Sequence, residues 1–318
     1  MTKGLLAVVL ASLVGFATQV QSYPDRGVTI VVPASPGGVT DFIGRLLAQS
    51  LTSRWGKSVI VENRAGGGTL TGAVAVARAS PDGHELLVMP LGVLFNSILS
   101  KTNSINFERD LIPISVVADQ SFCLVVNADL PVADVKGLIA YAKQKPGELS
   151  YGTVGPGSLP DIAAELLKSM SGTDMVGIPY GGNTPAMTDL LAGRIHLLFL
   201  PLGSALPFIN EGKVRAIGVS GLQRDEEAPQ IPTIAEDLPG FVIVTWQALM
   251  TTGGTPMPVV EKLNKEVNEI TSDPDTLAKL KKLHLTRRPS ATVAENRDFV
   301  LAEVQKWRPI LERIGVSK

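Results

Sequence analysis

Cysteine is almost absent from this sequence, because Cys123 is the only one in 318 residues. A single thiol cannot form an internal disulfide, and Cys123 lies in the apolar run 122–126, so we expect a small buried hydrophobic residue. The three histidines, His84, His196 and His284, are far apart and show no spacing typical of paired metal ligands. We therefore expect neither a disulfide framework nor a bound metal ion.

An excess of positive charge is also lacking, since 29 Lys and Arg residues are balanced by 30 Asp and Glu residues. A nucleic-acid-binding protein requires a basic surface, so the composition argues against nucleic acid as a partner.

The sequence patterns of common enzyme classes are missing as well. Residues 56–58 read Gly-Lys-Ser but lack the upstream glycine of a phosphate-binding loop, and no serine has glycine at both second-neighbour positions. We predict no catalytic residues and no cofactor. A small secreted hydrolase or transferase is the enzyme alternative, but it would need a nucleophile and a base near the loops described below, and neither can be identified.

No hydrophobic run is long enough to span a membrane. At the N-terminus, Lys3 supplies a positive charge, residues 4–17 are uncharged and mostly apolar, and small residues precede Tyr23. This pattern predicts a cleavable signal peptide over residues 1–22, with an uncleaved membrane anchor as the alternative. No cysteine follows the expected cleavage site, so we expect an exported protein without a lipid anchor.

Along the rest of the chain, short β-branched runs alternate with amphipathic runs. Strands are predicted at 28–32, 58–62, 85–89, 149–153, 175–180, 195–200, 214–220 and 242–250. Helices are predicted at 42–51, 70–79, 132–143, 159–170, 185–192, 204–209, 258–270, 275–283 and 293–314. This alternation is typical of an α/β protein with a largely parallel sheet. The apolar stretch 112–127 lacks a helical pattern and is interpreted as a crossing between two domains, with the polar segment 223–232 as the return linker.

The glycine loop 33–41 joins the first predicted strand to the first helix. Gly37 and Gly38 allow a ligand to approach the main chain, and the following helix presents unpaired N–H groups and the positive end of its dipole. Such a junction favours a bound anion. The alternative is a tight turn in which Thr40 or Asp41 only caps the helix.

A second loop repeats this pattern in the other half of the chain. Gly37 precedes Asp41 by four residues, and Gly157 precedes Asp161 by the same number; both loops follow a predicted strand and open a helix. A third junction, residues 180–185, also opens a helix. Ligands of α/β domains bind outside the carboxyl ends of the strands, so these loops predict an anion held between two domains. None of the loops contains Lys or Arg, so main-chain N–H groups, hydroxyls and water must meet the ligand charge.

The sequence resembles the periplasmic solute receptors of tripartite tricarboxylate transporters, also called Bug receptors. The resemblance runs from Tyr23 to near the C-terminus and rests on many short motifs in order. These are Tyr23-Pro24, Val31-Val32-Pro33 with Gly37-Gly38-x-x-Asp41, Val61-Glu62-Asn63-Arg64-x-Gly66, Ser80-Pro81-Asp82-Gly83, Pro179-Tyr180-x-Gly182, Thr188-Asp189-Leu190-Leu191-x-Gly193, and the segment from Pro229 to Glu236.

The resemblance implies a type II periplasmic-binding-protein fold, with two α/β lobes joined by crossing strands and a ligand cleft between them. Lobe 1 is predicted to contain residues 23–121 and 223–318, and lobe 2 residues 122–222. The implied partners are a small organic carboxylate and the membrane subunits of a tripartite tricarboxylate-type transporter. We expect a periplasmic monomer. A receptor that signals through a membrane sensor kinase is the alternative.

The resemblance also implies which residues hold the ligand, partly through ordered water. The candidates in the three loops are Ala34, Ser35, Gly37, Gly38, Thr40, Asp41, Val154, Gly155, Gly157, Ser158, Tyr180, Gly181, Asn183 and Thr184. Two further segments depart from the family pattern. Leu200 and Pro201 replace a frequent Asp-Asn pair, and residues 90–94, which include Leu91 and Gly92, replace small hydroxyl residues. We therefore predict a relatively apolar carboxylate, either aromatic or a longer aliphatic acid.

Overall fold

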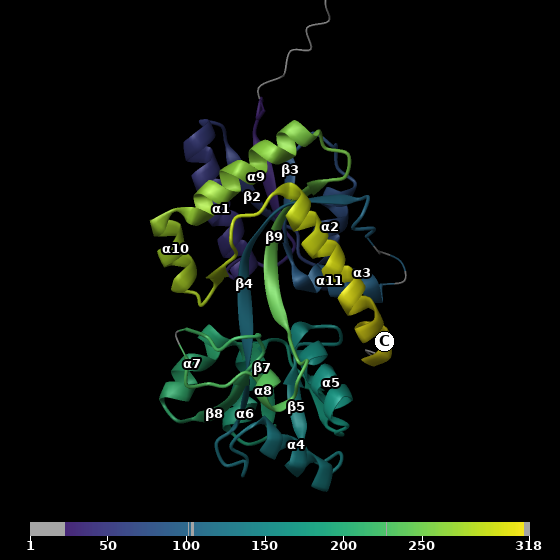
Figure 1. Cartoon of the computed structure of the whole chain (residues 1–318), viewed down its shortest axis with the longest axis vertical. Helices are drawn as coiled ribbons and strands as arrows, with labels where there is room; N and C mark the ends of the chain where they lie inside the picture. Colours follow the sequence, from purple (N-terminus) through teal and green to yellow (C-terminus); the bar gives the residue numbers. More distant parts are fainter. Residues whose placement is uncertain (1–22, 101, 103–104, 227, 315–318) are drawn as a thin grey trace, which may run out of the picture.

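The structure, a computed structural model, describes residues 23–100, 102, 105–226 and 228–314. The predicted signal peptide, residues 1–22, lies outside the described residues. Two α/β lobes are stacked along the long axis of the molecule (Figure 1). Among the residues described, no helix has both the length and the apolar character that crossing a membrane requires.

Two long strands run between the lobes, β4 (Leu111–Asn127) and β9 (Val244–Thr252). The first part of β4 pairs antiparallel with β9, and its last part pairs with two strands of the other lobe. Most of β4 is buried, which explains why its sequence is apolar without a helical pattern. The predicted crossing at 112–127 is confirmed.

Lobe 1 is the upper body in Figure 1. Its elements are β1 (Val28–Val32), α1 (Val39–Trp55), β2 (Val59–Asn63), η1 (Gly67–Thr69), α2 (Leu70–Ala77), β3 (Glu85–Pro90), α3 (Leu91–Leu99), α9 (Met257–Ser272), α10 (Pro274–Lys281), β10 (Thr286–Arg287) and α11 (Val293–Ile314). The sheet order is β2-β1-β3-β9-β4. Residues of α1, α9 and α10 form a hydrophobic cluster on one face of this sheet, and residues of α2, α3 and α11 pack on the other.

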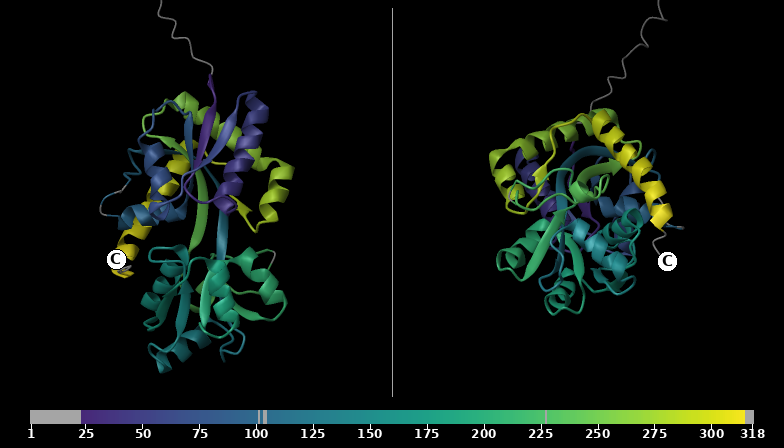
Figure 2. Two further views of the ribbon diagram at one scale, coloured as in Figure 1. Left: turned by 180° about the vertical axis from the view of Figure 1, so that it is seen from behind. Right: turned by 60° about the horizontal axis from the view of Figure 1, so that its bottom comes forward.

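Lobe 2 is the lower body. Its elements are α4 (Val135–Gln144), β5 (Ser150–Thr153), α5 (Leu159–Ser171), β6 (Val176–Pro179), α6 (Asn183–Leu191), β7 (Leu197–Pro201), α7 (Leu202–Asn210), β8 (Val214–Val219) and α8 (Ile234–Asp237). The sheet continues from β4 through β7 and β5 to β6, and β8 pairs with β4. The view from behind shows the same two bodies joined by β4 and β9 (Figure 2).

The core contains large aromatic side chains as well as aliphatic ones. Trp246 of β9 and Trp307 of α11 are almost completely buried, and both indole N–H groups donate to Oε2 of Glu303, over 3.1 and 3.0 Å. Cys123 is fully buried, as predicted, and burial raises the pKa of its thiol.

Two expectations about topology were wrong. The sheet is mixed, because the pairs among β1, β2, β3 and among β5, β6, β7 are parallel whereas every pair made by β4 or β9 is antiparallel. The segment 223–232 is not the return crossing. The chain stays with lobe 2 up to about Ile243, whose N–H bonds to Ser220, and Phe241 stacks on Phe199 with the ring centres 6.1 Å apart. The return boundary therefore lies near Val244, later than the predicted 222/223.

Helix α3 was also missed. No helix was predicted directly after the strand 85–89, but Pro90 is the N-cap residue of a helix that begins at Leu91. Most of its residues are buried, so the sequence shows no polar face from which a helical period could be detected.

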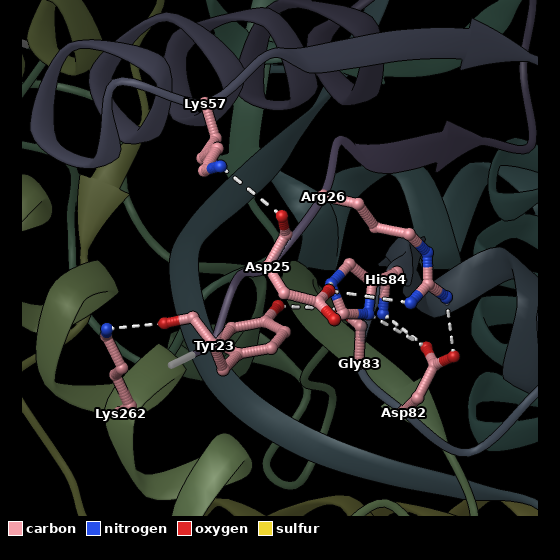
Figure 3. A network of polar contacts seen from close by, with 8 residues as sticks. All are labelled: Tyr23, Asp25, Arg26, Lys57, Asp82, Gly83, His84 and Lys262. Carbon is pink, nitrogen blue, oxygen red and sulfur yellow. Dashed lines mark hydrogen bonds and ion pairs between the residues drawn. The ribbon is translucent and has the colours of Figure 1, made fainter. Parts of the chain in front are cut away.

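The first described residues are tied to lobe 1 by the network in Figure 3. The Tyr23 hydroxyl donates to the Gly83 carbonyl over 2.7 Å, and Lys262 Nζ donates to the Tyr23 carbonyl over 2.6 Å. The His84 ring lies between Asp25 and Asp82, with N–O distances of 3.0 and 3.1 Å. Gly83 precedes β3, so this network lies at the amino end of the strand, away from the candidate loops.

Candidate functional site

The first candidate loop is shaped by Asp41, in the first turn of α1. Its Oδ2 accepts from the Gly37 N–H and from Arg45 Nε, both over 2.9 Å, and its Oδ1 accepts from Asn63 Nδ2 over 2.9 Å. Asn63 also donates to the Ala34 carbonyl over 3.0 Å. Both carboxylate oxygens therefore accept hydrogen bonds within lobe 1, so Asp41 holds the loop in shape.

The second loop has the same geometry. The Gly157 N–H donates to Asp161 Oδ2 over 2.9 Å, which matches the bond from Gly37 to Asp41 in length and in sequence separation. Gly37 and Gly157 have φ values of 91° and 75°, a conformation that favours glycine. The repeat predicted from the sequence is thus confirmed as a repeat of local structure in the two lobes.

The helix that follows each loop begins in the same way. Gly38 and Ser158 are the N-cap residues of α1 and α5, and both have extended backbone, with φ of −87° and −70°. In both loops the positive-φ glycine directly precedes the N-cap residue, so the unpaired N–H groups of the first helical turn follow immediately. These groups carry the positive end of the helix dipole, and they suit a carboxylate oxygen.

The two aspartates differ in their electrostatic surroundings. The hydrogen bond from Arg45, with those from Gly37 and Asn63, lowers the pKa of Asp41 to about 2. Burial raises the pKa of Asp161, and the negative charge of nearby Glu165 adds to this effect. The same loop geometry is therefore held by a carboxyl group whose pKa is lowered in lobe 1 and by one whose pKa is raised in lobe 2.

The third loop follows β6. The Tyr180 hydroxyl donates to Asp189 Oδ2 over 2.9 Å, and Arg194 also bonds to Asp189. Burial and the bond to Asp189 raise the pKa of Tyr180. Asn183 begins α6, and Thr184 beside it is exposed. The Tyr180 hydroxyl is thus engaged within lobe 2, whereas Gly181 and Thr184 are accessible.

All of the candidate glycines except Gly157 have open space beside the main chain. An added Cβ atom would meet no other heavy atom within 4 Å at five of them, Gly37, Gly38, Gly92, Gly155 and Gly181. Gly37 and Gly38 are exposed, as is Ser35, while Ala34 is partly exposed and Thr40 is buried. The backbone at these positions is therefore open to an approaching molecule.

Asn96 of α3 lies beside loops of both lobes, and sequence reasoning missed it. A Cβ atom on Gly68 of η1 would lie 3.0 Å from Asn96 Oδ1, and one on Gly157 of lobe 2 would lie 3.3 Å from the same oxygen. The Asn96 amide donates to the Gly92 carbonyl over 2.9 Å. Because helix α3 itself was not predicted, no sequence signal indicated that residue 96 would lie between the lobes.

Two of the apolar residues that were predicted to bind the ligand, Leu91 and Leu200, are buried. Leu91 is fully buried and Leu200 is 2% exposed, so neither side chain offers surface to a ligand in this conformation. Both pack into hydrophobic clusters, because Leu91 directly follows the buried strand β3 and Leu200 lies within the buried strand β7. Gly92 and Pro201 are partly exposed, and Val154 is 37% exposed. The apolar surface near the loops is therefore supplied by Val154 and Pro201.

The arrangement is suited to holding an anion by main-chain groups. In the described part of the chain, no three His, Cys, Asp or Glu side chains are grouped so that they could hold a metal ion. The candidate loops contribute no cationic side chain, and Arg45, which adjoins them, is paired with Asp41. What the loops share is exposed backbone at the start of a helix.

The chain is similar to several known proteins. A family model described as the tripartite tricarboxylate transporter family receptor matches residues 43–316. Protein BugT of Bordetella pertussis is 33% identical over 320 residues, which cover 98% of this chain and 98% of BugT.

Solved structures are similar as well. A protein of R. palustris solved with adipate has a TM-score of 0.80 and 31% sequence identity, over 93% of this chain and 99% of that one. The periplasmic binding protein BugD has a TM-score of 0.77 and 32% identity, over 93% of this chain and 100% of BugD.

Proposed function

Since the chain belongs to the tripartite tricarboxylate transporter receptor family, we propose that it captures a small organic carboxylate by closure of its two lobes. It then delivers the ligand to the membrane subunits of a tripartite tricarboxylate-type transporter. The observation that carries this proposal is the pair of matching loops, in which Gly37 and Gly157 make the same bond to an aspartate four residues later. Each lobe thus presents one helix N-terminus whose unpaired N–H groups can bind the ligand.

Lobe closure has a physical reason in this arrangement. A carboxylate that contacts the loops of both lobes gains its full set of contacts only when the lobes are together, so binding favours the closed state. In this proposal the contacts come from the main chain of the loops 34–38, 154–158 and 181–184. Asp41 and Asp161 act indirectly, because their carboxylates shape the loops.

The proposed ligand is relatively apolar apart from its carboxylate. Support comes from the exposed Val154 and the partly exposed Pro201, and from the lack of a cationic side chain in the loops. Adipate, bound by a relative 31% identical to this chain, is an aliphatic acid of this kind. The proposed location is the periplasm, where the related BugD acts as a binding protein, and the proposed state is a monomer.

Thermal-shift screening tests the proposal. We expect adipate or an aromatic acid such as benzoate to raise the melting temperature, because a ligand that binds only the folded state stabilises it. Citrate, aspartate and glutamate should have smaller effects. Strong stabilisation by these three acids, with none from aliphatic or aromatic acids, would contradict the proposal of an apolar ligand. If no carboxylate in the panel changes the melting temperature, the proposed receptor function is wrong.

A further inference from the structure

His284 of lobe 1 lies against the first turn of α7 in lobe 2. A Cβ atom added to Gly203, the second residue of α7, would lie 2.6 Å from His284 Cδ2 and 3.3 Å from its Cγ. Carbon atoms in good contact are about 3.5–4.0 Å apart, so only glycine at position 203 leaves room for the imidazole ring. In Figure 1, α10 of lobe 1 and α7 of lobe 2 lie on the same side of the crossing strands.

His284 departs from the local preference of its turn. It lies in the turn that ends α10, and its φ is +53°; among the residues that the structure describes, only Thr69 and His284 combine a positive φ with a side chain. Left-handed residues in such turns are usually glycine, because a side chain strains the backbone there. The ring atom Nδ1 is also buried and has no hydrogen-bond partner among the described residues. Neither feature is explained by the turn itself.

Gly203 departs from the local preference of its helix. Glycine inside a helix is unfavourable relative to alanine, because it loses more backbone freedom on folding. Gly203 lies in α7 and its φ is not in the left-handed region, so the helix itself does not require glycine there. The contact with His284 does require it. One contact thus accounts for two residues that each break a local rule, and such positions tend to be functional.

The lobes also touch on the other side of the crossing strands. A Cβ atom added to Gly157 would lie 3.3 Å from Leu99 Cδ1 and 3.3 Å from Asn96 Oδ1, both of α3. In Figure 1, α3 and α5 lie on the opposite side from α10 and α7. Gly157 follows the end of β5, and Gly203 follows the end of β7. The lobes are therefore together at both flanks, and moving them apart breaks these contacts.

We propose that His284 is a positioning residue for lobe closure, because its contact with Gly203 sets the closest approach of the two lobes. This inference rests on the proposed function, since the spacing decides whether one carboxylate can reach the loops of both lobes. His284 acts through this spacing and does not touch the ligand. A larger side chain at position 203 keeps the lobes apart, although it strengthens helix α7.

Gly203→Ala in the full mature chain tests the inference. Without ligand we expect an equal or higher melting temperature, because alanine favours the helix and the lobes are free to separate. In isothermal titration calorimetry with adipate, or with benzoate if wild type does not bind adipate, we expect about tenfold weaker binding. A tenfold loss corresponds to about a tenth of the molecules being able to reach the closed spacing.

His284→Gly combined with Gly203→Ala should restore the affinity to within about threefold of wild type, because the added methyl group then meets no ring. The two substitutions are thus strongly non-additive, as expected for residues in direct contact. His284→Gly alone should weaken binding less than Gly203→Ala does. A role of Gly203 confined to helix α7 would give no such rescue.

Small-angle X-ray scattering without ligand reads the lobe spacing directly. Gly203→Ala should have a larger radius of gyration than wild type, and the double variant should return to the wild-type value.

Ser204→Leu is the matched control, because it enlarges an exposed neighbour in the same turn of α7 and should change neither the radius nor the affinity. Unchanged affinity of Gly203→Ala, or a double variant that binds as weakly as Gly203→Ala, overturns the inference and leaves the receptor function standing. If no carboxylate binds wild type, the proposed function fails. Equal radii for all four proteins overturn the inference whether or not a ligand binds.

Discussion

Asp41 and Asp161 hold equivalent positions in the two lobes, yet their surroundings shift their pKa values in opposite directions. Arg45 and Asn63 bond to the ionised Asp41, whereas Asp161 is buried near Glu165. The sequence repeat predicted the shared geometry. It did not reveal this difference, because Asn63 comes from another strand and burial depends on the whole fold.

Asp41→Asn should destabilise the chain most at neutral pH. The folded-state pKa of about 2 lies below the ordinary value of 3.8, so the ionised form contributes stability above pH 3.8 that is lost as the pH falls through 2. We expect a loss of about 1–3 kcal/mol at pH 7 from the weakened charged hydrogen bonds, and a smaller loss near pH 3. Urea denaturation at several pH values measures this.

Asp161→Asn is the matched control with the opposite sign. Because the pKa of Asp161 is raised in the folded state, wild type loses stability as the pH rises past the ordinary value and the carboxyl group ionises. The free energy of unfolding of Asp161→Asn, relative to that of wild type, should therefore be higher at pH 7 than at acid pH. If both variants lose more stability at neutral pH, the contrast between the two loops is wrong.

Asn96 shows what could not be predicted at the scale of single residues. It lies outside the glycine loops and outside the motifs of the family resemblance. Asn96 lies beside loops of both lobes because α3 follows β3 directly. Since helix α3 was not predicted, no local signal in the sequence placed residue 96 there.

At the scale of elements, the strand-to-helix junctions were predictable because glycine, proline and capping residues mark them locally. The loops before α1, α5 and α6 lie where the sequence placed them, although α1 begins three residues earlier, at Val39. Helix α3 could not be predicted because most of it is buried. Strand β10 is only two residues long, and it is defined by its pairing with β4.

The turn before β3 offers a test of how the chain start is held. Gly83 has φ of +82°, and a Cβ atom there would lie 2.6 Å from Val259 and 3.1 Å from Tyr23. Gly83→Ala should therefore cost about 2–4 kcal/mol, from backbone strain and crowding together, as measured by denaturant unfolding.

The variant Gly56→Ala separates the cost of backbone strain from the cost of crowding. Gly56 also has positive φ, 62°, but no atom lies within 4 Å of its Cβ position, so only strain of about 1 kcal/mol is expected. Equal costs at the two glycines would show that the contacts of Tyr23 in Figure 3 do not constrain this turn.

At the scale of the whole molecule, the two-lobed α/β architecture was predicted from the alternation of elements, from the unbroken apolar stretch of β4 and from the family resemblance. The antiparallel direction of the crossing strands was not, because alternation alone favours parallel pairing. The later return point near Val244 depends on packing of residues 228–243 against lobe 2, including Phe241 on Phe199.

In the proposed closed molecule, one carboxylate is held by the starts of α1 and α5 together. Gly38 and Ser158, the two N-cap residues, have ordinary extended φ, so valine can replace either without backbone strain. The Cβ position of Gly38 is also unobstructed. At either position the valine side chain would stand where the ligand meets the main chain.

The most direct measurement is a calorimetric titration of wild type, Gly38→Val and Ser158→Val with the carboxylate that stabilises the chain most. We predict that each variant keeps a melting temperature within a few degrees of wild type and binds the carboxylate at least tenfold more weakly. Unchanged affinity in either variant would contradict the claim that both lobes hold the ligand, and would leave that loop as a turn that only starts its helix.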